Sequence, residues 1–459
     1  MSKSMLTSFY IIFSSIISCT SILLLLGTFQ VTNCFTAEVT SSSPPRHDSS
    51  NYLEILASNT PLLDVRAPIE FAKGSFPNAH NIPLLNDQHR ELIGTCYKEE
   101  GQDAAIALGY ALVNDNDDRN LKSELVQSWK DHIELYPNGY LYCFRGGLRS
   151  HMVQQWLQDA GVHYPLIIGG YKAMRSSLLL DLQVSLQTLP IVLIGGRTCS
   201  GKTIALTQLS RYVDLEGLAN HRGSAFGAIA RGGQPAQIDF ENSIIIEFTK
   251  HRRLHGHVHL HGQSSSTGSA TCTLPVFMED EGHRIGDLTL PIPMYRPMAN
   301  EFPLVILETP LQERVEICIQ EYIQDPFLAF RLDGTHEGNG NDNDYDKDDC
   351  VHSKGEAHAR IRNTFLGAVG RIQKGLQKRL GGARDRGNDI RGEFETAFDL
   401  FQSSNASNVS GFRKPIQSLL EDYYDPMYDY QMSKRQGEIL FHGNMKELVK
   451  WAEDYRTTK

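Results

Sequence analysis

The sequence has no CxxC pair among its eight cysteines, and their positions follow no regular spacing. In a chain of 459 residues, scattered cysteines indicate reduced thiols and exclude a disulfide framework. The cysteine and histidine spacing of zinc modules is also absent, so the sequence predicts no metal site.

The sequence also has no excess of basic residues, which would be expected of a strongly cationic RNA-binding protein. Its formal net charge is −10. The segment 333–349 accounts for −6 of this, because it holds seven acidic residues and one lysine. The rest of the chain is only mildly acidic, so a local basic surface would be sufficient for contact with RNA. The length is enough for two or three domains.

Charged residues are missing from 5–29, a stretch preceded by Lys3 and followed by a hydroxyl-rich segment. This pattern predicts a signal-like and then transit-like targeting segment over residues 1–50, outside the fold. Such a bipartite segment is typical of proteins sent to a plastid. A membrane anchor is the alternative, since 25 uncharged residues could span a bilayer. A cytoplasmic location is the third possibility.

Residues 51–185 alternate short apolar segments with helical patterns. We predict strands at 61–66, 140–143 and 166–169 and a helix over 147–160, whose apolar residues recur at helical spacing. Strands that alternate with helices indicate a parallel α/β sheet.

Cys143 ends one of these predicted strands and begins a glycine-rich turn into a helix. Consecutive backbone N–H groups at such a turn bind anions, and nearby arginines favour the thiolate form of a cysteine. Cys143 is therefore a candidate nucleophile. The alternative is a buried cysteine with two solvent-exposed arginines. The proposed anion cradle is made of Arg145, Gly146, Gly147 and Arg149.

The order of motifs in this region resembles the rhodanese family. The matches are the D-V-R-x-x-x-E-F segment at 64–71, the turn at 74–83 and the cysteine loop. In rhodaneses the loop cysteine carries a persulfide, so the resemblance implies that Cys143 is a carrier. The Cys-x5-Arg spacing is also similar to that of cysteine phosphatases, which leaves phosphatase activity open for this domain.

A second domain is predicted over 186–459, with a P-loop near its start and a helical C-terminal part. The apolar strand 190–195 leads into G-x-x-x-x-G-K-T and then a helix, the setting that a phosphate-binding loop requires. The phosphate-binding residues are Gly196, Gly201, Lys202 and Thr203. We interpret Cys199 as a tolerated small residue. Either 276–281 or 304–308 fits a strand carrying the acidic partner of the P-loop, and no arginine finger can be identified.

Four further segments, at 93–98, 214–227, 279–286 and 423–428, complete a resemblance to bacterial tRNA 2-selenouridine synthases. This family joins a rhodanese domain to a P-loop domain and acts as a transferase on wobble 2-thiouridine of tRNA. The resemblance implies geranyl diphosphate and selenophosphate as substrates, with an S-geranyl intermediate. It also implies a selenium-transfer role for Cys143. We infer that the P-loop holds the diphosphate, that no cofactor is tightly bound, and that Mg²⁺ could take part.

Two other hypotheses remain open from the sequence. One is a rhodanese-type sulfurtransferase or cysteine phosphatase fused to a nucleotide-binding, kinase-like P-loop domain. The other is a non-catalytic phosphate-binding module.

Two insertions, 251–271 and 333–356, depart from the family pattern. We interpret the first as a flexible loop, with a metal site at its alternating His255, His257, His259 and His261 as the alternative. After the second, apolar residues from Ile361 to Leu380 recur every three or four positions and predict an amphipathic helix. Its polar side offers a possible tRNA-binding surface. The residues concerned are Arg371, Lys374, Lys378 and Arg379. The Tyr-rich segment 423–428 could either stack on bases or pack in a core.

Overall fold

The structure is a computed structural model, in which Arg46–Lys459 form one compact unit. The described residues are 46–114, 121–223, 233–260, 272–328, 359, 361–374, 390–404, 406–455 and 457–458. Across these residues, no helix combines the length and apolar character that a membrane crossing needs. The predicted targeting segment up to residue 45 and the insertion 333–356 lie outside the described residues, so the organelle assignment stays a prediction.

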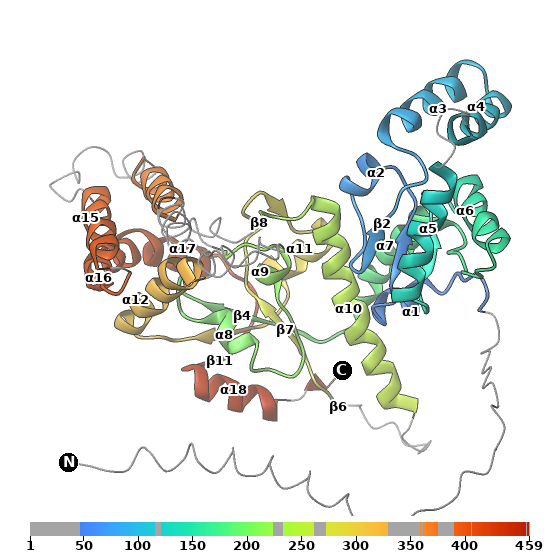
Figure 1. Ribbon diagram of the computed structural model, residues 1–459. Helices are drawn as coiled ribbons and strands as arrows, with labels where there is room; N and C mark the ends of the chain where they lie inside the picture. The colour runs from blue at the N-terminus through green and yellow to red at the C-terminus, as the bar shows by residue number, and fades with distance from the viewer. Residues whose placement is uncertain are drawn as a thin grey trace, which may run out of the picture. The chain divides into compact units, whose positions relative to one another are not determined.

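The N-terminal sheet, which contains the strand labelled β2 in Figure 1, is parallel, as predicted, with strand order β2-β1-β3. Its strands are β1 (Leu62–Asp64), β2 (Ala79–Asn81) and β3 (Tyr140–Tyr142). The strand predicted at 166–169 is reduced to single bridges, which pair Leu166 with Leu141 and Ile167 with Ser49. Residues before the predicted start at 51 also pack here, because Ser49 joins this sheet and Arg46 donates to the carbonyl of Gly139.

Helices surround this sheet. The helix predicted at 147–160 is confirmed as α6 (Leu148–Asp159), which buries Val153 and Leu157 in a cluster with Leu63, Trp129 and Leu141. The other helices of this part are α1 (Tyr52–Ala57), α2 (Pro68–Ala72), α3 (Asp87–Glu99), α4 (Gln102–Asn114) and α5 (Leu121–Leu135).

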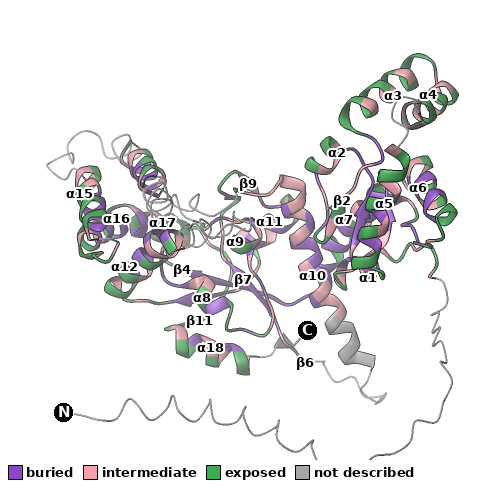
Figure 2. Ribbon diagram, viewed as in Figure 1, coloured by how far each residue is buried: buried purple, intermediate pink, exposed green. Residues whose placement is uncertain are grey.

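The second sheet has five parallel strands in the order β11-β10-β4-β7-β5. They are β4 (Ile191–Gly196), β5 (Tyr212–Val213), β7 (Val276–Glu279), β10 (Leu304–Leu307) and β11 (Ile439–Gly443). Strands β4, β7 and β10 are buried along their whole length, as expected of central strands in a parallel sheet, and β4 and β7 can be followed in Figure 2. Helices α8 (Lys202–Leu206) and α18 (Met445–Asp454) pack against it.

Smaller elements complete this domain. They are α9 (Leu215–Leu218), α11 (Ile292–Asn300), the antiparallel pair β8 (Arg284–Ile285) and β9 (Leu288–Thr289), and the pair β6 (Cys272–Thr273) and β12 (Thr457–Thr458).

The C-terminal part is helical, as predicted, and two of its helices contain a π-helical segment. The first runs through α12 (Leu311–Ile319) and η2 (Gln320–Gln324). The second runs through α16 (Arg413–Leu419), η4 (Leu420–Tyr424) and α17 (Asp425–Met432). The short 3₁₀ helix η3 (Ser410–Phe412) precedes the second, and α15 (Ile390–Ser403) packs beside it.

The predicted amphipathic helix is confirmed over 361–374, where Ile361, Phe365, Val369 and Ile372 are buried. Phe365 meets the rings of Phe394 and Phe398 edge-on, which builds an aromatic core for the helical part. Leu376 and Leu380 lie outside the described residues.

The helices α7 (Gly170–Thr188) and α10 (Gln237–Leu260) join the two sheets into one body. One apolar cluster continues from Tyr142 through Leu178 to Ile244 and Leu193. The predicted domain boundary at 185/186 therefore falls inside α7, within a shared core.

Polar contacts fix the same junction. The buried carboxylate of Asp181 on α7 accepts a 2.7 Å hydrogen bond from Thr249 Oγ1 and pairs with Arg252, both on α10. Asn242 donates to the carbonyl of Ser75 over 2.6 Å. The interpretation of the first insertion as a flexible loop from residue 251 is therefore wrong for its first residues, because Arg252 belongs to a packed helix. Residues 261–271 lie outside the described residues.

Candidate active sites

The cysteine loop begins where β3 ends and leads into α6. Gly146 has a φ of +60°, and a Cβ at this position would lie 2.7 Å from the backbone nitrogen of Gly169. Glycine is therefore required at this position. The N–H of Tyr171 donates to the carbonyl of Cys143 over 3.0 Å, so the first turn of α7 holds the loop in place. Gly147, by contrast, faces open space.

The sulfur of Cys143 lies beneath this loop. The residue is only 3% exposed and belongs to the apolar cluster of α6 and β1. Its Sγ is 3.3 Å from Oγ of Ser150, and that hydroxyl donates to the carbonyl of Gly147 over 2.9 Å. The sequence predicts a thiol at the mouth of the cradle, whereas the structure places it below the mouth.

The two arginines of the predicted cradle differ. Arg149 forms two hydrogen bonds to Glu70 of α2, of 2.5 and 3.1 Å. Burial opposes ionisation of Glu70, but these bonds hold the pKa of its carboxyl below the ordinary value. Arg149 is therefore already neutralised. Arg145 is exposed and is the cation that remains open to an anion at this loop.

The P-loop connects β4 to α8. Gly196, Gly201, Lys202 and Thr203 all lie at the carboxyl end of β4, so the structure brings this predicted set together. Gly201 caps α8 with a φ of +82°, a conformation that favours glycine. Lys202 Nζ donates to the carbonyl of Gly196 over 3.4 Å.

Thr203 faces two glutamates. Its Oγ1 is 3.3 Å from Oε1 of Glu279 and 3.4 Å from Oε2 of Glu216. Glu279 is fully buried at the end of β7 and also accepts from the N–H of Leu215 over 2.9 Å. Of the two candidate acidic strands, β7 is therefore the partner of the P-loop. Glu308, which follows β10, instead contacts His442 at 3.2 Å.

The segments predicted at 214–227 and 279–286 meet at the same edge of the sheet. A Cβ on Gly223 would lie 2.4 Å from Glu216 and 2.9 Å from Glu281, and a Cβ on Gly286 would lie 2.6 Å from the ring of His221. These segments follow β5 and β7, beside the P-loop that follows β4. The carboxyl edge is where ligands bind in open parallel sheets. Residues 224–227 lie outside the described residues.

The carboxyl groups beside Thr203 bind protons strongly. Burial, together with the neighbouring Glu281, raises the pKa of Glu216 to about 8. Burial and the charges of Asp214 and Glu216 raise the pKa of Glu279 well above its ordinary value. Sequence reasoning missed Glu216, because α9 brings it to Thr203 only through tertiary packing.

This proton binding predicts a pH-dependent stability. The folded-state pKa of Glu216 lies near 8 against an ordinary value of 4.5, so its stabilising contribution is complete below 4.5 and is lost as the pH rises to 8. Between pH 5 and 8 the unfolding free energy of the wild type should therefore fall, and we expect the fall in Glu216→Gln to be smaller by ~2 kcal/mol. Chemical denaturation at several pH values measures this. Glu308→Gln, at a side chain 64% exposed, is the control; an unchanged slope in Glu216→Gln would contradict the prediction.

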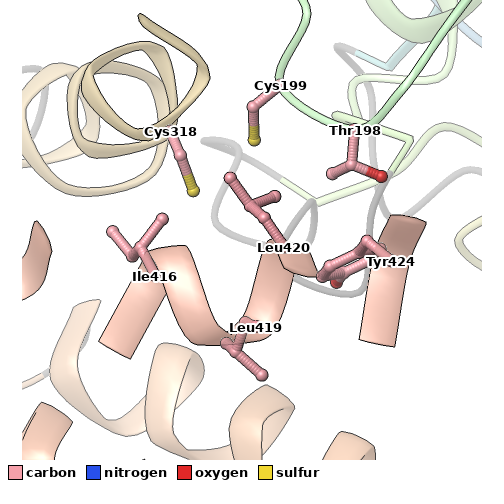
Figure 3. Close-up of a pocket in the computed structure, with 7 residues that line it drawn as sticks. All are labelled: Thr198, Cys199, Cys318, Ile416, Leu419, Leu420 and Tyr424. Atoms are coloured by element: carbon pink, nitrogen blue, oxygen red, sulfur yellow. The ribbon is translucent and has the colours of Figure 1, made fainter. Parts of the chain in front are cut away.

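The Tyr-rich segment packs next to the P-loop residues Thr198 and Cys199. Tyr424 is 4% exposed and, with Cys199, Cys318, Ile416, Leu419, Leu420 and Thr198, lines a cavity of about 10 Å³ (Figure 3). Tyr424 therefore packs in a core. Hydrogen bonding to Cys199, with burial, raises the pKa of the Cys318 thiol, which makes that thiol a packing group.

Comparison with known proteins identifies the family. A family model described as the tRNA 2-selenouridine synthase AAA domain matches residues 189–459. A tRNA 2-selenouridine synthase of Marinobacter nauticus is 41% identical, with 90% of this chain and 99% of the relative aligned. The chain belongs to the tRNA 2-selenouridine synthase family. Synthases of Alcanivorax borkumensis and Pseudomonas entomophila are 39% and 40% identical over 88% of this chain and 98% and 95% of their own lengths.

As a tRNA 2-selenouridine synthase, the chain is a transferase that modifies tRNA. This confirms the resemblance inferred from the six motifs. The hypothesis of a sulfurtransferase or phosphatase fused to a kinase-like domain is not favoured, because the similarity covers the two domains together.

Proposed function

We propose that this tRNA 2-selenouridine synthase converts wobble 2-thiouridine into 2-selenouridine in two steps that use different loops. The P-loop binds geranyl diphosphate for the first step, and the Cys143 loop receives selenophosphate for the second. One observation carries the proposal: a single compact unit holds two glycine-rich turns, of which one has a cysteine and the other a lysine whose Nζ donates to a backbone carbonyl.

In the first step, the sulfur of 2-thiouridine attacks C1 of the geranyl group. The C1–O bond breaks, both of its electrons leave with diphosphate, and the proton on N3 passes to solvent. Backbone N–H groups of the P-loop and Nζ of Lys202 would neutralise the charge that develops on the leaving group. The weak 3.4 Å contact between Lys202 and Gly196 would be exchanged for this charge-assisted contact.

In the second step, selenium replaces sulfur at C2 of the base. The C2–S bond breaks and geranyl thiol leaves, and water then cleaves the P–Se bond so that phosphate departs. Arg145 and the open face over Gly147 would hold the phosphate-like end of selenophosphate next to Cys143. We propose that the Cys143 thiol is the group that positions selenium for transfer.

Mg²⁺ is proposed to accompany the diphosphate, and no other cofactor. Within the described part of the chain, no group of three or more His, Cys, Asp or Glu side chains is placed to hold a metal ion. Thr203 and Glu279 would therefore supply the protein ligands, with substrate oxygens completing the shell. Mg²⁺ commonly binds in this way, through one or two carboxylates and substrate phosphates.

The helix 361–374 supports a contact with the tRNA backbone, because Arg371 and Lys374 are exposed on the side opposite its buried face. Lys378 and Arg379 lie outside the described residues and remain candidates for the same surface.

We expect Arg371→Glu combined with Lys374→Glu to weaken tRNA binding by about tenfold at moderate salt and to reduce its salt dependence, because each phosphate contact releases counterions. Filter binding across a salt series measures both quantities. Lys446→Glu with Lys450→Glu makes the same charge change on the exposed side of α18 and serves as the control. Equal losses in the two double variants would remove the helix from the tRNA footprint.

The proposed function is tested by incubating purified protein with 2-thiouridine tRNA and geranyl diphosphate, then adding selenophosphate. Nucleoside mass spectrometry should detect S-geranyl-2-thiouridine first and 2-selenouridine afterwards. Selenouridine formation without any need for geranyl diphosphate would overturn the two-step proposal.

A further inference from the structure

The P-loop carries a second cation, Arg197, in addition to Lys202. Its guanidinium spans two carboxylates of α17, with Nη1 3.0 Å from Oδ2 of Asp425 and Nη2 2.8 Å from Oδ1 of Asp429. The two aspartates are four residues apart, so they share one face of the helix, and that face is turned toward the P-loop.

Asp425 does not depend on Arg197 for its charge balance. Arg314 of α12 binds both of its carboxylate oxygens, at 3.0 and 2.6 Å, and donates from Nε to the carbonyl of Thr198 in the P-loop over 3.0 Å. The side chain of Arg314 is 3% exposed and that of Asp425 is 12% exposed. This buried pair anchors the P-loop to the helical part by itself.

The contact between Arg197 and Asp429, in contrast, is exposed to solvent. The side chains are 43% and 58% exposed, so the pair is hydrated and weak. Breaking it leaves neither a buried charge nor a loose P-loop, because Arg314 keeps its contacts with Asp425 and Thr198. Arg197 is thus a cation of the loop that can change partners at little cost.

We propose that Arg197 is a ligand of the diphosphate: when substrate binds, its guanidinium leaves Asp429 and takes phosphate oxygens. The inference rests on the proposed function, in which the P-loop holds the diphosphate of geranyl diphosphate. A diphosphate bears several negative charges, and Lys202 supplies only a single point charge. The planar guanidinium adds a bidentate contact with charge that grows on the leaving group. Asp429 acts as a competitor that holds Arg197 in the absence of substrate.

Inorganic pyrophosphate with Mg²⁺ is the probe, and isothermal titration measures its affinity for the full-length protein. We expect Arg197→Ala to weaken pyrophosphate binding by about tenfold. Asp429→Asn should tighten it about two- to fivefold, since the competing carboxylate is gone. If Arg197 and Asp429 only maintained the structure, both substitutions would disrupt the same ion pair and would change the affinity in the same direction, which would overturn the proposal.

Three controls separate the possible failures. Arg413→Ala removes an arginine of similar exposure, 49%, that pairs with Glu316 of α12 and not with a helix α17 carboxylate, and it should leave the affinity unchanged. An equal loss of affinity in Arg413→Ala would mean that the effect comes from overall charge, which would refute the proposal.

Lys202→Ala tests the proposed function: if it leaves pyrophosphate binding intact, the P-loop is not the diphosphate site. If only Arg197→Ala is without effect, the inference fails and the proposed function stands. Thermal unfolding of each variant confirms folding.

Discussion

Replacing Cys143 with serine should stop selenium incorporation and leave geranyl transfer to tRNA intact. Serine preserves the size of the side chain and its contact with Ser150, so the loop and the core around it should remain folded. A hydroxyl cannot replace the thiol that positions selenium for transfer, and we expect the rate of selenation to fall roughly a hundredfold. The assay supplies S-geranyl tRNA and selenophosphate directly and measures 2-selenouridine by mass spectrometry.

Cys96→Ser is the matched control for this result, because Cys96 is a free, half-buried cysteine on α3 outside the loop. It should support both steps at wild-type rates. Selenation by Cys143→Ser at the wild-type rate would remove Cys143 from the reaction. Slow alkylation of Cys143 by iodoacetamide in the free enzyme would agree with its 3% exposure.

Replacing Lys202 with alanine should produce the reverse pattern. Geranyl transfer should fall by about a hundredfold or more, because the leaving diphosphate loses its nearest cation in the loop. Selenation of tRNA that already carries the geranyl group should continue. The measurements are the rate of S-geranyl nucleoside formation and, separately, the rate of its conversion by selenophosphate.

Lys250→Ala removes a lysine of α10, with a side chain 27% exposed, and should affect neither step. Mixing Lys202→Ala with Cys143→Ser should restore the full conversion if the geranylated tRNA is released between the steps. Loss of both steps in Lys202→Ala would instead mean that the two reactions share one site.

The sequence predicts what depends on neighbours in the chain. The P-loop and the cysteine loop each occupy one continuous segment, and glycines such as Gly146 and Gly201 adopt positive φ angles within it. An apolar strand, a glycine turn and a helix start are all local properties, so both loops and the parallel sheets around them could be predicted.

Contacts between segments that are far apart in the chain could not be predicted from such local patterns. Arg314 and Asp425 are 111 positions apart, and Arg149 and Glu70 are 79 apart. Either arginine could have been a free anion ligand as far as the sequence indicates. The depth of Cys143 also depends on packing from α6 and β1. In each case a tertiary partner determines what the side chain can do, and no sequence motif identifies that partner.

Packing also crosses the boundaries predicted at residues 50 and 185, for a related reason. Asp48 looks like the end of a hydroxyl-rich linker, yet its carboxylate accepts hydrogen bonds from Leu166 and Gln154. Residues 170–188 look like an ordinary amphipathic helix, and the sequence does not reveal that both sheets contribute to the core around it.

Helices α7 and α10 bury apolar residues against one another. Cutting the gene between them would therefore yield two polypeptides that each expose an apolar face. Separately expressed halves should aggregate, or recover activity only when produced together as complementing fragments. The continuity of the chain through α7 and α10 is then a requirement for solubility.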